Sequence, residues 1–71
     1  MIETTQLSLQ EIIQDFNQEI DRNPKLADAY CSRGMLKLCV NDIAGAFMDL
    51  TTAIDLGCKD AFILVKYFSY L

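Results

Sequence analysis

The sequence predicts an all-α fold of four helices, packed as antiparallel helix-turn-helix pairs. Apolar residues recur at helical spacing, turn-forming residues separate these segments, and no useful stretch alternates apolar and polar residues with a period of two. The chain has 71 residues, 52% of them apolar, and a mean hydropathy of +0.19. This length allows one domain at most, and this composition argues against a disordered chain.

The first predicted helix covers 8–22, with Ser8 as its N-cap. Ser8 and Glu11 have the spacing of a capping box. Asn23 and Pro24 end the helix, because the residue before a proline is disfavoured in the α region. The apolar positions in between are Leu9, Ile12, Ile13, Phe16 and Ile20.

Two further helices are predicted on either side of a tight turn at Asn41 and Asp42. The second covers about 27–40. Asparagine tolerates the left-handed conformation at a helix C-terminus and aspartate is a strong N-cap, so two residues suffice for the turn. The third helix ends at Gly57, with Asp49 on its solvated face. The inward positions expected along it are Ile43, Ala46, Phe47, Leu50, Ala53 and Ile54.

A fourth helix is predicted over 61–71, with Asp60 as its cap. Lys66 and Ser69 are its clearly polar positions, so it is apolar almost all round. One neighbouring helix cannot cover such a surface, and we expect it to be buried by a partner. The segment has about half of the roughly 20 residues that a membrane-spanning helix needs. A transmembrane segment is therefore not expected.

Charge and composition argue against several functional classes. The formal charge is −4, and its acidic excess lies before Pro24 with no basic cluster, so neither nucleic acid nor an anionic membrane is an expected partner. The chain has no histidine and no Gly-rich phosphate loop, so we expect no enzyme and no cofactor. The N-terminus has no secretory pattern, which favours the cytoplasm.

The chain has three cysteines, Cys31, Cys39 and Cys58. Their spacing lacks a CxxC pair, so we expect no metal site and free thiols in a reducing compartment. Cys31 and Cys39 lie eight residues apart, hence about 12 Å apart along a helix, and cannot bridge each other. We expect both to be small buried apolar residues.

An internal repeat carries a resemblance to a known family. A shift of 34 residues superposes Asp15 on Asp49, Ile20 on Ile54, Lys25 on Lys59 and Ala27 on Ala61, and 34 residues is the tetratricopeptide length. The set that follows resembles a common variant of the tetratricopeptide repeat (TPR): Ala27, Asp28, Ala29, Tyr30, Arg33, Gly34, Lys37, Asp42, Gly45, Ala46, Asp49, Leu50, Ala53 and Ile54.

The resemblance implies that 1–71 is a single TPR-like domain, a short right-handed superhelix of four helices. In it, 27–60 is a full repeat, 8–22 the second helix of a preceding half repeat, and 61–71 the first helix of a following one. Gly34 then takes the small position at which helices approach closely. Glu19, Cys58 and Phe68 depart from the pattern, and because Phe68 stands at the glycine position we expect the last helix to pack differently from a regular repeat helix.

The family binds peptides or proteins in a concave groove lined by first helices. Carried over position by position, the predicted partner-binding residues are Asp28, Cys31, Ser32, Met35, Cys39, Phe62, Val65, Lys66 and Ser69. The Lys and Asn set with which some members clamp C-terminal carboxylates is absent, since Cys31, Ser32 and Met35 hold those places. Binding of chaperone tails is therefore not expected.

Two functions remain open. The first is a non-enzymatic protein-interaction module that takes an apolar segment of a partner. The second is a structural unit that assembles as a homodimer or larger oligomer, since solenoids generally need at least about three repeats. A fragment of a longer repeat array, whose last helix meets a helix not present here, is the competing explanation. The predicted oligomer interface is Phe62, Ile63, Val65, Tyr67, Phe68, Tyr70 and Leu71.

Overall fold

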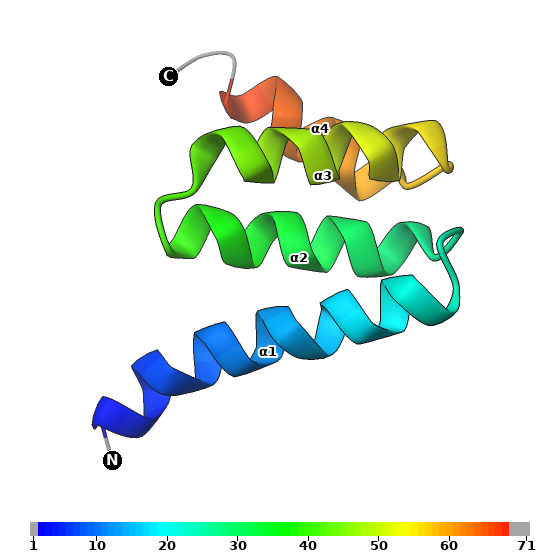
Figure 1. Ribbon diagram of the computed structural model, residues 1–71. Coiled ribbons are helices and arrows are strands. Elements are labelled where there is room, and N and C mark those ends of the chain that lie inside the picture. Colours follow the sequence, from blue (N-terminus) through cyan, green and yellow to red (C-terminus); the bar gives the residue numbers. More distant parts are fainter. Residues whose placement is uncertain (1, 69–71) are drawn as a thin grey trace.

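The computed structural model describes the backbone of residues 2–68 and the side chains of 9–67. Four helices follow one another: α1 (Ile2–Arg22), α2 (Ala27–Cys39), α3 (Ile43–Asp55) and α4 (Lys59–Phe68). Each packs against the next, and successive helices run in opposite directions (Figure 1). Within residues 2–68 there is no strand, so the predicted all-α class with helix-turn-helix packing is confirmed.

The turns after α2 and α3 have the same backbone design. Asn41 has a φ of 67° and Gly57 a φ of 102°, both in the left-handed region. In each turn the left-handed residue and its successor donate N–H bonds back to carbonyls of the last helical turn, which is the Schellman motif. These bonds are Asn41 to Leu38 at 3.0 Å, Asp42 to Lys37 at 2.8 Å, Gly57 to Ile54 at 2.9 Å and Cys58 to Ala53 at 2.9 Å.

Asp42 begins α3 as predicted. Its carboxylate accepts a hydrogen bond of 3.1 Å from the Gly45 backbone N–H, so it caps one of the free donors at the helix start. The prediction for Asp60 is wrong, because α4 begins one residue earlier, at Lys59. Asp60 lies inside the first turn, where a negative charge still favours the positive end of the helix dipole.

The start of α1 also differs from the prediction. The helix begins at Ile2, so Ser8 lies within it and is not its N-cap. The residues before Ser8 include neither glycine nor proline, and a helix that is already nucleated extends easily through such residues. The capping-box pattern at Ser8 therefore does not coincide with the N-terminus of this helix.

The core lies between α2, α3 and the start of α4. Ala46, Leu50, Ala53 and Ala61 are completely buried. A Cβ atom on Gly34 would lie 2.9 Å from the Leu50 Cγ and 3.2 Å from the Ala46 carbonyl oxygen, so the glycine permits the close approach of α2 and α3, as expected. Ile43, expected to face inward, is instead exposed on the first turn of α3.

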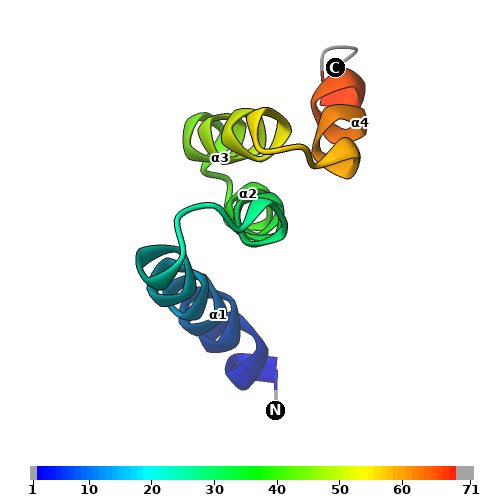
Figure 2. The same ribbon diagram turned by 90° about the vertical axis from the view of Figure 1, so that its right-hand side faces the viewer.

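In the end-on view of Figure 2, α4 lies beside α3, with α2 below them and α1 at the far end of the stack. Ala61 of α4 and Cys31 of α2 belong to the same buried cluster as Leu50 and Ala53. No helix within residues 2–68 has both the length and the apolar character needed to cross a bilayer.

Candidate functional site

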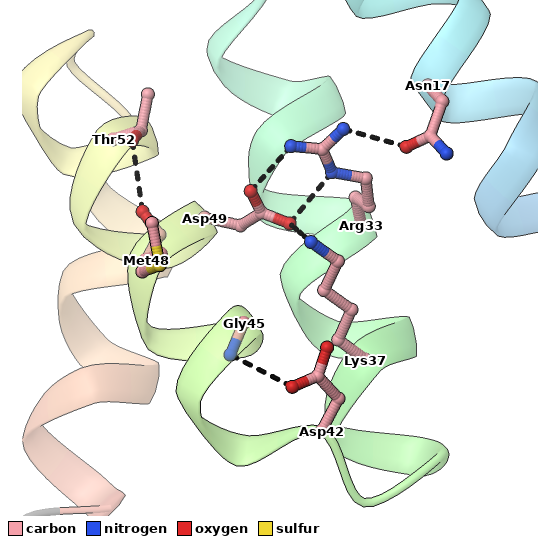
Figure 3. A network of polar contacts seen from close by, with 8 residues as sticks. All are labelled: Asn17, Arg33, Lys37, Asp42, Gly45, Met48, Asp49 and Thr52. Carbon is pink, nitrogen blue, oxygen red and sulfur yellow. Dashed lines mark hydrogen bonds and ion pairs between the residues drawn. The ribbon is translucent and has the colours of Figure 1, made fainter.

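An ion-pair network centred on the buried Asp49 holds α2 against α3 and reaches α1. The carboxylate of Asp49 accepts two bonds from the Arg33 guanidinium, at 2.8 Å from Nε and 2.7 Å from Nη2, and lies 3.0 Å from the Lys37 Nζ. The remaining Nη1 of Arg33 donates to the Asn17 side-chain oxygen on α1 at 2.7 Å. Figure 3 shows Arg33 between Asp49 and Asn17, so one side chain links three helices.

Asp49 was predicted to face solvent, and this prediction is wrong. The residue is only 5% exposed. Burial alone would raise the pKa of its carboxyl, but the hydrogen bonds and positive charges of Arg33 and Lys37 outweigh burial and hold that pKa below its ordinary value. The same pairing raises the pKa of Arg33 further above its usual range.

The contacts of this network indicate a structural role. Three N–H donors occupy the Asp49 carboxylate, and its lowered pKa makes it a weaker base than a free aspartate. Arg33 also lies 5.6 Å from the centroid of the Tyr30 ring, a cation–π distance. The Tyr30 contact lies within α2, whereas the contacts to Asp49 and Asn17 fix the position of α2 between α3 and α1.

A sequence signal for this network existed. Asp49 shares one helical face with Ala46 and Ala53, three and four residues away, and both are buried. Arg33 and Lys37 are likewise four residues apart on the facing helix. An acid inside an apolar stripe, opposite two bases on one face, indicates a buried ion pair.

The predicted groove residues of α2 divide into two groups. Asp28, Met35 and Cys39 are exposed and Ser32 is partly exposed; we call these four the α2 stripe, because their helical spacing puts them on one side. Cys31 points into the core instead and is buried, so it does not belong to the exposed stripe. The expectation that Cys39 is buried is wrong, since it lies at the end of α2, beyond the contact with the core.

On α4, a ten-residue helix, three large apolar side chains are more than half exposed. The exposed fractions are 57% for Phe62, 51% for Ile63 and 68% for Tyr67; we call these three the α4 surface. Ala61, Leu64 and Val65 occupy the opposite side and pack into the core cluster. The polar residue Lys66 is exposed beside them.

Four further residues of the last helix were predicted to bind a partner or to form the oligomer interface. Ser69, Tyr70 and Leu71 lie beyond the described residues, and Phe68 ends α4 with its backbone alone described. Within the described part, Cys31 of α2 and Ala61 of α4 belong to the same buried core cluster. The α2 stripe and the α4 surface thus belong to two helices that meet in the same cluster.

Among the described residues, no group of three or more Cys, Asp or Glu side chains is arranged to hold a metal ion. Comparison with known proteins gives no match to a family model, a curated protein or a solved structure.

Proposed function

We propose that the chain is a non-enzymatic protein-interaction module that binds a peptide or partner protein through the α4 surface and the α2 stripe. The observation that carries this proposal is the exposure of Phe62, Ile63 and Tyr67 on one short helix. Clustered exposed apolar side chains with a polar border are typical of interaction sites.

The energetics favour an apolar partner segment. Fully burying a side chain such as Phe or Ile is worth about 1.5–3 kcal/mol, and each of these three begins more than half exposed. Aromatic anchors also dominate the binding energy of many interfaces. Lys66 and Asp28 are exposed near the apolar residues of their helices and supply a charged rim.

The resemblance to TPR proteins supports the same proposal. Gly34 lies against Leu50 and Ala46 in the way that the family's small packing position implies. We propose a TPR-like right-handed superhelix in which 27–60 is the full repeat, and a cytoplasmic location. The α2 stripe and the Phe62 side of α4 then correspond to the family's groove.

A binding screen tests this function with matched variants. The chain is applied to an array of apolar and amphipathic peptides, and bound peptides are compared for wild type, Phe62→Asp, Met35→Asp and Met48→Asp. Met48 is the control, because it is 72% exposed but lies on α3, which contributes no residue to the proposed surface. Helix content from circular dichroism confirms that each variant is folded.

Selective loss of peptide binding in Phe62→Asp and Met35→Asp, with binding retained in Met48→Asp, supports the module. Binding that survives both substitutions, or that all three reduce equally, contradicts it.

A second candidate function is self-assembly, and the position of Ile63 and Tyr67 favours it. These residues are four apart and form one row along the exposed side of α4, about 100° around the helix from Phe62. Light scattering behind size exclusion at tens of micromolar tests this with Ile63→Glu and Tyr67→Glu. A dimer that these variants convert to a folded monomer supports self-assembly, whereas a wild-type monomer contradicts it.

A further inference from the structure

Two of the three cysteines come together in the core, although they are far apart in the sequence. Cys31 lies on α2 and is buried in the cluster formed with Leu50, Ala53 and Ala61. Cys58 precedes α4, is partly buried, and packs against the same cluster. Because both side chains lie at this cluster, the Cys58 thiol adds to the rise in the pKa of Cys31 that burial causes.

The backbone holds both thiols in place. Cys31 is fixed within α2, between Ala27 and Cys39. Cys58 is fixed by the Schellman turn, in which its N–H donates to the Ala53 carbonyl at 2.9 Å while Gly57 adopts the left-handed conformation. A bond between the two sulfurs therefore joins positions that the fold already brings together.

We propose that Cys31 and Cys58 are a dithiol site that forms a reversible disulfide by exchange with a small-molecule disulfide such as oxidised glutathione. The bond would tie α2 to the start of α4. This inference is independent of the proposed function, since it concerns the core and not the exposed surface.

The exchange proceeds in two displacements. The Cys58 thiolate attacks one sulfur of oxidised glutathione, forming a mixed disulfide and releasing one glutathione thiolate. The Cys31 thiolate then attacks the Cys58 sulfur, which forms the Cys31–Cys58 bond and releases the second glutathione thiolate. The two protein thiols lose two electrons, the glutathione disulfide gains them, and the two thiol protons pass to the released thiolates.

Exposure decides which thiol reacts first. Cys58 is partly exposed and can meet a small disulfide, whereas Cys31 is enclosed. Burial is the largest cause that raises the pKa of Cys31, to about 11, and the Cys58 thiol and the charges of Asp60 and Asp28 add to it. A Cys58 thiolate disfavours the ionisation of Cys31 by charge repulsion. Once Cys58 is in a mixed disulfide, this repulsion is gone.

Cys39 does not take part in this pair. It is exposed at the end of α2, about 12 Å along the helix from Cys31. Replacing it with serine removes a competing thiol without disturbing the core, and Cys39→Ser is therefore the reference protein for the test.

The test equilibrates the folded reference protein with mixtures of oxidised and reduced glutathione. Intact mass and digestion with mass spectrometry then locate the modified sulfurs. We expect the loss of two hydrogen atoms and a linked peptide pair containing Cys31 and Cys58. Adding Cys31→Ala should trap glutathione on Cys58, at a level about tenfold above that in the reference, because the intramolecular second step is absent. Adding Cys58→Ser should leave Cys31 unmodified.

The opposite results overturn the proposal. They are a stable glutathione adduct on Cys58 in the reference protein with no Cys31–Cys58 peptide, a disulfide that joins two chains, or direct glutathione modification of Cys31 in Cys58→Ser. Circular dichroism shows that each variant retains its helices, and Cys31→Val replaces Cys31→Ala if the alanine variant does not fold.

Discussion

Replacing Asp49 with asparagine tests the ion-pair network most directly. The substitution keeps the size of the side chain and removes its charge, so Arg33 and Lys37 lose their buried partner. The core beside Asp49, including the completely buried Leu50, is otherwise unchanged. The measured effect therefore comes from the uncompensated positive charges.

Burial sets the size of the effect. Removing one member of a fully buried ion pair costs about 3–5 kcal/mol. The side chains of Arg33 and Lys37 are 17% and 23% exposed, so both can recover some hydration, and we expect a loss of about 2–3 kcal/mol. A chain of 71 residues has an unfolding free energy of about 4–10 kcal/mol, so this loss is a large fraction of it.

Urea unfolding followed by circular dichroism measures the change, and thermal unfolding should show a midpoint about 10–20 °C lower. Asp55→Asn is the matched control, because Asp55 is on the same helix and is exposed. We expect the control to stay within about 0.5 kcal/mol of wild type. If Asp49→Asn behaves like Asp55→Asn, the network does not stabilise the fold and the reasoning is refuted.

Three further stability predictions follow from the same structure. The folded-state pKa of Asp49 lies below its ordinary value, so its stabilising free energy is present above that ordinary value and is lost as the pH falls through the lowered pKa. The free energies of unfolding of wild type and Asp49→Asn, measured at pH 2–7, should therefore converge at low pH. A constant difference between them would contradict this. Gly34→Ala should lower the free energy of unfolding in urea by about 1 kcal/mol, because the steric cost of the new Cβ against Leu50 exceeds the gain in helix propensity. An equal or higher stability would show that Leu50 moves aside. Asp42→Ala should cost about 1 kcal/mol by loss of the α3 cap, with Asp42→Asn as the control that keeps a capping oxygen, and equal losses in both would count against the cap.

The turns and the middle helices could be predicted from the sequence because their signals are local. Asn41 and Gly57 are both left-handed, Asp42 caps α3, and Gly34 packs closely, each for a reason that depends on one residue type. The start of α1 was mistaken because the spacing of Ser8 and Glu11, which is typical of a capping box, here lies inside a longer helix. Local patterns restrict where a helix can begin but do not exclude extension.

The candidate sites were harder to predict, because they depend on contacts between helices. Asp49 was assigned to solvent from its helical spacing and from the usual exposure of carboxylates, although its partners lie on another helix. Cys58 was treated as a departure from a repeat pattern, and its proximity to Cys31 requires the packed α2, α3 and α4. Exposure of Phe62, in contrast, followed from the apolar excess of the last helix.

The arrangement of these features separates folding from binding. The Arg33 network acts between α1, α2 and α3, whereas Ala61 and its neighbours join α4 to the core by apolar contacts. Substitutions on the outer side of α4, such as Ile63→Glu, remove none of the core contacts of Ala61. A surface variant that abolishes an interaction while the urea midpoint stays unchanged therefore reports on binding alone, and a variant at Asp49 reports on folding alone.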